Sequence, residues 1–245
     1  MGKIIFIAGT DTGVGKTLLT ALLLIHARAR GRNALAIKPF CSGGREDVEI
    51  LQKAQNHAIS DEMVNPWYFD APVAPWVSLR EKRENINKHA VLAHLHAVQK
   101  KTDLLLVEGA GGLLSPLAKN LDAREIIAAL DCPVLLVARN RLGCLNHVFL
   151  SLEALEKNGA RPVKVVLMGD RRPDLSARTN AEILRKKAGF IDVFAIPWLG
   201  ARASGLGALK KNEKKIKKTL ARLFEFAYIP RRSLPNRRKT GGKKK

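Results

Sequence analysis

The chain has 245 residues, 46% of them hydrophobic, which is enough for one large folded unit with a substantial core. Its 43 Lys or Arg residues face 22 Asp or Glu residues, giving a formal net charge of +21. Three cysteines, an odd number without the spacing of metal ligands, argue against a disulfide framework or a structural zinc site.

Short apolar runs alternate with amphipathic helical patterns along the chain. The predicted strands are 4–8, 34–37, 104–107, 134–138, 163–167 and 193–196, and the predicted helices are 17–30, 46–56, 87–100, 122–130, 146–157, 178–188 and 208–227. This alternation predicts right-handed crossovers and an α/β fold, with a mostly parallel sheet flanked by helices on both faces. Without an internal repeat or linker, we expect a single domain over residues 1–227.

The first strand leads into a loop of small residues and then into a helix, in the sequence KIIFIAGTDTGVGKT. Backbone N–H groups in such a loop cradle phosphate groups. Gly15, Lys16 and Thr17 fit the phosphate-loop pattern, although the first glycine, Gly9, falls one place early. Lys16 can reach terminal phosphates, and the Thr17 hydroxyl can bind Mg²⁺. The alternative is a glycine-rich turn with a chance lysine.

Charged residues also stand where later strands end. Lys38 follows the second predicted strand, and Glu108 follows the third. Since ligands of such sheets bind beyond the carboxyl ends of the strands, we expect one shared site. Lys38 could neutralise a transferring phosphoryl group, or it could be a solvated edge charge.

Thr17, Asp47 and Glu108 together form a plausible set of oxygen ligands for Mg²⁺. Each carboxylate also has a simpler interpretation, because acidic side chains favour the first turns of helices. Asn146, which opens a predicted helix with the backbone of 143–145, suits binding of a carboxylate or phosphate. An ordinary asparagine cap is the alternative.

Five segments occur in the order and spacing of dethiobiotin synthetase: GTDTGVGKT, KPFCSGGREDVEIL, PVAPW, VEGAGGLLSPL and PVLLVARNRLGCLNHVFLSLEAL. The chain resembles this family from about residue 1 to 200. The resemblance implies a P-loop NTPase architecture and a homodimer. It also implies closure of the ureido ring of dethiobiotin, in biotin biosynthesis, from 7,8-diaminononanoate, CO₂ and ATP with Mg²⁺.

The resemblance implies roles for particular residues. Lys16 and Lys38 would be catalytic, and Thr17, Asp47 and Glu108 would hold Mg²⁺. The nucleotide would contact Gly13, Val14, Gly15, Lys16, Thr17, Leu18, Asp47, Glu108, Gly109, Ala110, Gly111, Pro197, Trp198 and Leu199. The substrate would contact Thr12, Ser42, Gly143, Cys144, Leu145 and Asn146, the last four across the dimer interface. The chain departs from the family at Met168, where an Asn often reads adenine, and at Trp76, where many members have His.

The basic charge is concentrated near the end of the chain. Residues 210–245 contain 15 Lys or Arg and 2 Glu, a net of +13, which leaves +8 for the rest. We expect the tail, 228–245, to be disordered and at most to attract nucleic acid non-specifically. No apolar run approaches the ~20 residues that span a bilayer, and the N-terminus leads directly into a strand, so we expect a cytoplasmic protein without a signal peptide.

Two other classes of protein compete with this interpretation. A partitioning or positioning ATPase of the deviant P-loop group would bind DNA or membrane through its basic tail. Those proteins resemble K-G-G-x-G-K-T at the loop, whereas Asp11 stands here at the position of their signature lysine. An amidotransferase-linked cobyrinate or cobyrate synthetase would need a glutaminase domain, for which the chain has no room.

Overall fold

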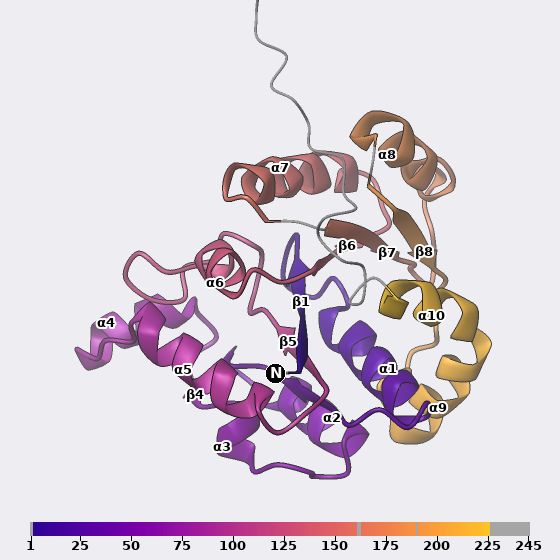
Figure 1. The fold of residues 1–245 in the computed structure, drawn as a ribbon. Coiled ribbons are helices and arrows are strands. Elements are labelled where there is room, and N and C mark those ends of the chain that lie inside the picture. Colours follow the sequence, from indigo (N-terminus) through magenta and orange to yellow (C-terminus); the bar gives the residue numbers. More distant parts are fainter. Residues whose placement is uncertain (1, 161–162, 190, 226–245) are drawn as a thin grey trace, which may run out of the picture.

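Within residues 2–160, 163–189 and 191–225, which the computed structural model describes, six parallel strands form a central sheet (Figure 1). Their order is β2-β5-β1-β6-β7-β8. The strands are β1 (Lys3–Gly9), β2 (Ala34–Ile37), β5 (Leu104–Glu108), β6 (Val134–Arg139), β7 (Val163–Met168) and β8 (Val193–Ile196). The predicted fold class is confirmed, with helices on both faces of a parallel sheet.

Helices cover the sheet because its strands are apolar on both sides. Along β1, Ile4 and Phe6 belong to one core cluster, whereas Ile5 and Ile7 belong to the other. The helices α1 (Lys16–Arg28), α2 (Glu46–Ala54), α9 (Leu206–Lys215) and α10 (Lys217–Glu225) pack on one face, and α5 (Lys88–Gln99), α6 (Ala123–Leu130), α7 (Cys144–Lys157) and α8 (Asn180–Ala188) pack on the other (Figure 1).

Several short elements escaped prediction. They are β3 (Phe40–Ser42), β4 (Trp67–Phe69), α3 (Asp61–Val64), α4 (Pro75–Lys82) and the 3₁₀ turn η1 (Leu175–Arg178). The strands β3 and β4 form a separate parallel pair, and three residues are too few to show a periodicity. The pair is nevertheless important, because β3 begins two residues after Lys38.

The last predicted helix, 208–227, is two helices that meet at Ile216. Its predicted apolar stripe is confirmed, since Leu209, Ile216, Leu220, Leu223 and Phe224 are all buried. The tail 228–245 lies outside the described residues. Among the helices that the structure describes, none has both the length and the apolar character needed to cross a membrane.

Candidate active site

The loop between β1 and α1 has the backbone shape that a phosphate-binding loop requires. Gly13 and Gly15 have positive φ angles of 68° and 99°, and no side chain caps the first turn of α1. The early glycine of the pattern also has a physical reason. A Cβ at Gly9 would lie 2.8 Å from Nζ of Lys16 and 2.9 Å from the backbone carbonyl oxygen of Asp11, so this position must stay small for the loop and the lysine to keep their places.

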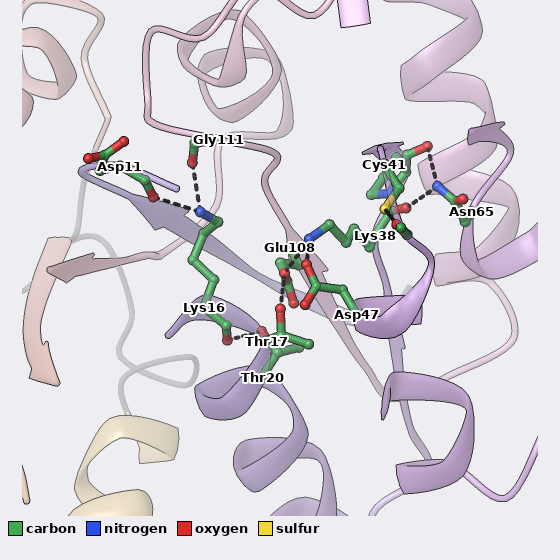
Figure 2. A network of polar contacts seen from close by, with 12 residues as sticks. Asp11, Lys16, Thr17, Thr20, Lys38, Cys41, Asp47, Asn65, Glu108 and Gly111 are labelled. Atoms are coloured by element: carbon green, nitrogen blue, oxygen red, sulfur yellow. Dashed lines mark hydrogen bonds and ion pairs between the residues drawn. The ribbon is translucent and has the colours of Figure 1, made fainter. Parts of the chain in front are cut away.

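Lys16 is buried and is held by two backbone carbonyls. Its Nζ donates to the carbonyl oxygens of Asp11 at 2.9 Å and Gly111 at 2.7 Å (Figure 2). Burial lowers the pKa of Lys16 from 10.5 to about 8, although the Glu108 carboxylate opposes the shift. The first turn of α1 and the loop after β5 are therefore joined through one ammonium group.

A second lysine lies between two carboxylates that come from different elements. Nζ of Lys38 donates to Oε1 of Glu108 at 3.0 Å and to Oδ2 of Asp47 (Figure 2). The hydroxyl of Thr17 donates to the same Glu108 oxygen at 2.7 Å. Four residues predicted from separate segments thus share one hydrogen-bonded network at the carboxyl ends of β1, β2 and β5.

The lysine and the carboxylates of this network each favour the charged form of the other. Burial lowers the pKa of Lys38, but the carboxylates of Glu108 and Asp47 outweigh it, so that the pKa is raised above its ordinary value. Burial raises the pKa of Asp47, but the charge of Lys38 and hydrogen bonds from Lys38 and Thr17 lower it overall. Lys38 therefore remains protonated and Asp47 ionised at neutral pH.

The same residues fit a magnesium ion. Oε2 of Glu108 is buried and has no hydrogen-bond partner among the described residues, which leaves a carboxylate oxygen available to a ligand. Thr17 and Asp47 add a hydroxyl and a second carboxylate. Among the residues that the structure describes, no group of three or more His, Cys, Asp or Glu side chains could hold a metal ion alone. Such a small donor set suits Mg²⁺, which keeps waters and takes its remaining ligands from phosphates.

Asn65, which the sequence analysis missed, fixes the backbone around Lys38. Its buried amide nitrogen donates to the carbonyls of Lys38 at 2.8 Å and Pro39 at 3.2 Å. The Asn-Pro dipeptide at 65–66 predicts a turn but not this contact. Nearby, the buried hydroxyl of Ser42 has no partner among the described residues and remains available to a bound molecule.

A cleft of about 320 Å³ lies between the phosphate loop and the start of α7. It is lined by Thr10, Asp11, Thr12, Gly13, Val14, Arg139, Arg141, Leu142, Cys144, His147 and Asp174. The cleft joins the predicted loop residues to Cys144, whereas Gly143, Leu145 and Asn146 adjoin it without lining it. Arg141 and His147 were not predicted, although their position after β6 is the kind of place where ligands of parallel sheets bind.

The segment 197–199 lies beside the end of β7. A Cβ at Gly169 would come within 2.8 Å of the Trp198 nitrogen, so the two backbones touch. Trp198 is 39% exposed and Leu199 is buried. The side chain of Met168 lies against the phosphate loop. A Cβ added at Gly15 would be only 3.1 Å from Cγ of Met168. Met168 thus supports the loop through packing.

The remaining predicted nucleotide contacts have mixed surroundings. Gly109 already donates its N–H to the carbonyl of Ile7 at 2.9 Å, so this N–H is not free for phosphate. Ala110 is partly buried beside it, and Gly111 has a positive φ of 62° and gives its carbonyl to Lys16. Leu18 packs against the core beneath α1.

The chain has a phosphate loop on a parallel sheet, with two lysines and two carboxylates gathered beyond the carboxyl ends of the strands. These features define a P-loop nucleotide-binding protein. A family model described as "AAA domain" matches residues 3–203. Two solved structures share this fold. The MinC:MinD cell division complex of Aquifex aeolicus has a TM-score of 0.61 at 16% identity, covering 97% of this chain and 99% of that one. The pNOB8 ParA structure has a TM-score of 0.54 at 16% identity, covering 92% and 99%.

Curated relatives are closer in sequence. The ATP-dependent dethiobiotin synthetase BioD of Anaeromyxobacter dehalogenans (strain 2CP-1) is 35% identical over 213 residues, covering 84% of this chain and 96% of the relative. That of Bacillus subtilis (strain 168) is 33% identical over 190 residues, covering 75% and 82%. The chain belongs to the dethiobiotin synthetase family.

Proposed function

We propose that this chain is an ATP-dependent dethiobiotin synthetase of biotin biosynthesis. In this proposal it closes the ureido ring of dethiobiotin from 7,8-diaminononanoate, CO₂ and ATP, using residues 1–227 as one catalytic domain. The observation that supports it most strongly is the convergence on Glu108, whose Oε1 accepts hydrogen bonds from both Thr17 and Lys38. The start of α1, next to the phosphate loop, and the end of β2 therefore approach the same carboxylate.

The proposed reaction has three bond-forming steps. One amine nitrogen of the diamine attacks CO₂ and loses a proton, which gives a carbamate. A carbamate oxygen then attacks the γ-phosphorus of ATP as the bond to ADP breaks, which gives a carbamic-phosphoric anhydride. Finally the second amine attacks the carbonyl carbon, loses a proton and expels phosphate, which closes the ring. Each step needs positioning and neutralisation of charge more than an unusual base.

The two lysines divide the neutralisation of negative charge between them. When ATP binds, Nζ of Lys16 exchanges its hydrogen bonds to the carbonyl oxygens of Asp11 and Gly111 for hydrogen bonds to phosphate oxygens. Lys38 lies on the far side of Glu108 and is kept protonated by its carboxylate neighbours. It therefore offers a fixed positive charge to the carbamate and the transferring phosphoryl group.

In the proposed complex, Thr17, Asp47 and Glu108 hold Mg²⁺, which supplies positive charge that neutralises the phosphates of ATP. Gly13, Val14 and Gly15 give their backbone to the phosphates. Pro197, Trp198 and Leu199 flank the base, since they adjoin the strand end that packs on Gly15.

The diamine would lie in the cleft beside the phosphate loop. Thr12 lines this cleft, and Ser42 of β3, whose hydroxyl has no hydrogen-bond partner in the part of the chain that the structure describes, comes four residues after Lys38. The first turn of α7, from Gly143 to Asn146, would bind the substrate carboxylate across the interface of a homodimer, because its N–H groups lack a side-chain cap. Leu142 and Leu150, 80% and 57% exposed, flank that turn and would be covered by a second copy.

The experiment that tests this proposal is a synthesis assay in which each reactant is omitted in turn. Purified protein with diaminononanoate, bicarbonate, ATP and Mg²⁺ should yield dethiobiotin by mass spectrometry, and ATP turnover should require the diamine. The opposite outcome, ATP hydrolysis that DNA stimulates and the diamine does not affect, would favour a switch ATPase. Asp11, at the position of the switch proteins' signature lysine, already counts against that second candidate.

A further inference from the structure

The helices α9 and α10 present a row of cations to solvent. We call the exposed residues Lys210, Lys211, Lys214, Lys215, Lys217, Lys218 and Arg222 the basic face. None of its six lysines takes part in the ion pairs found among the described residues. Protein surfaces normally intersperse charges of both signs, so such a face is unusual.

The fold does not need these lysines. The helices are held by their apolar stripe, whose members Leu209, Leu220 and Leu223 are fully buried against α1. The one acidic residue of α9, Glu213, points inward and meets Nδ1 of the buried His26 of α1 at 2.7 Å. Glu213 is thereby withdrawn from the basic face, which leaves Glu225, at the end of α10, as the exposed acid of the two helices. Repulsion among the lysines destabilises the compact state, and a bound polyanion would neutralise it.

The basic face presents its cations in pairs on two successive helices. Lys210 and Lys214 lie on one side of α9, and Lys218 and Arg222 lie on one side of α10, each pair four residues apart. The two helices are separated by Ile216, whose φ of -111° and ψ of 20° end α9. With a rise of about 1.5 Å per residue, the two cations of each pair are about 6 Å apart along their own helix.

A hollow of about 480 Å³ adjoins α10. Arg222 lines it together with Arg185 of α8, and the Arg222 guanidinium lies 5.0 Å from the centre of the Phe194 ring. Asp192 is the one acidic residue in its lining, and Nζ of Lys164 meets that carboxylate at 3.2 Å. The hollow is thus a place where a phosphate group could contact two arginines.

We propose that the basic face binds the phosphate backbone of double-stranded nucleic acid without reading its sequence. A membrane is the less suitable partner, because the apolar side of α10, with Leu220 and Phe224, is buried in the core and cannot insert among lipids. The basic face shares no residue with the cleft or the lysine–carboxylate network. Binding there leaves the proposed synthesis reaction unaffected.

The test compares two triple variants of the full-length chain that change the charge equally. K210E/K214E/K218E alters the basic face, whereas K82E/K100E/K119E alters three exposed lysines elsewhere, and both lower the net charge from +21 to +15. Residues 226–245 stay intact in both. Binding to a fluorescent DNA duplex of about 20 base pairs is followed by anisotropy over a salt series.

We expect K210E/K214E/K218E to weaken duplex binding at least about tenfold at 0.1 M salt, and to flatten the slope of log K against log salt by about 2.7. The control variant should retain affinity within about twofold. Equal losses in both variants, or no binding by the unaltered protein, would overturn the proposal. Binding to phosphatidylserine vesicles in preference to the duplex would overturn it in favour of a lipid surface. Dethiobiotin synthesis, measured in parallel, reports separately on the enzyme.

Discussion

Lys38 is a buried cation whose two carboxylate partners are also the proposed magnesium ligands. This double role follows from where the chain places it, since Lys38 follows β2, Asp47 lies in the first turn of α2 and Glu108 ends β5. The lysine fixes the carboxylates before nucleotide arrives, and it remains charged afterwards. A substitution of Lys38 therefore affects both catalysis and folding, and the two effects are measured separately.

Lys38→Ala should lower the rate of dethiobiotin formation at least about a hundredfold, because the transferring phosphoryl group loses a fixed positive charge. Binding of ATP through the phosphate loop should persist, which isothermal titration can measure. Thermal melting checks the fold, since Glu108 loses a buried partner. Lys53→Ala, at an exposed lysine paired with Glu49, is the control and should leave the rate unchanged. Near-normal turnover of Lys38→Ala would remove Lys38 from the mechanism.

Lys16 gives a prediction about pH. Its pKa is about 8 in the folded protein and 10.5 as the ordinary value, so the folded protein releases this proton first. Stability should therefore rise with pH between about 8 and 10.5, whereas ATP affinity should fall as pH rises through about 8, because the neutral amine no longer attracts phosphate. Equilibrium ATP binding measured over this range checks the second effect.

Lys16→Arg is the matched control for that titration, since a guanidinium keeps its charge throughout. Its ATP affinity, although weaker, should not fall over the same interval. A wild-type affinity that stays constant from about pH 7 to 9.5 would show that Lys16 does not titrate in the phosphate loop.

Among the elements, the central strands could be predicted almost residue by residue. β2 and β8 begin and end as expected, and the other strands differ by one residue at one or both ends. Their apolar runs are continuous because both faces are buried, and this makes them easy to recognise. The pair β3 and β4 could not be found, because its short strands depend on each other through long-range pairing.

The site was predictable to the extent that it depends on strand ends. The rule that ligands bind beyond those ends is enough to bring Lys16, Lys38 and Glu108 together. Contacts made by the backbone were not predictable, such as the Lys16 bond to the Gly111 carbonyl or the clamp by Asn65. No side-chain pattern in the sequence encodes a carbonyl that accepts a hydrogen bond across 95 residues.

The phosphate loop allows a matched pair of glycine substitutions. Gly15→Ala should abolish ATP binding, because φ is 99° and the new Cβ would press on Met168 at 3.1 Å. Gly31→Ala has a comparable φ of 74° but meets no atom within 4 Å, so it should cost about 1 kcal/mol of stability and leave ATP binding intact. Urea unfolding and ATP titration of both variants distinguish loop geometry from general strain. Retained ATP affinity in Gly15→Ala would contradict this account of the loop.

At the scale of the whole molecule, the two faces of the sheet carry helices with different proposed roles. One face carries α1 with the phosphate loop and, packed against it, the helices of the basic face. The other carries α7, whose first turn borders the cleft and whose flanking leucines are exposed. The proposed reaction and dimer interface therefore meet where the phosphate loop approaches α7.

The double variant L142E/L150E should convert the proposed dimer into monomers, because charged side chains would have to be buried in the interface. Analytical ultracentrifugation at micromolar concentration checks the change. Val77→Glu, at an exposed apolar residue of α4, is the control and should leave the sedimentation coefficient unchanged. A variant L142E/L150E that remains dimeric would place the interface elsewhere.

The central claim is that the triphosphate, the carbamate and the diamine meet at one site. It is tested most directly by following oxygen from bicarbonate labelled with ¹⁸O during a single rapid turnover. If a carbamate oxygen attacks the γ-phosphorus, mass spectrometry should find one labelled oxygen in the released phosphate for each dethiobiotin formed. Unlabelled phosphate, with its new oxygen taken from water, would contradict the claim.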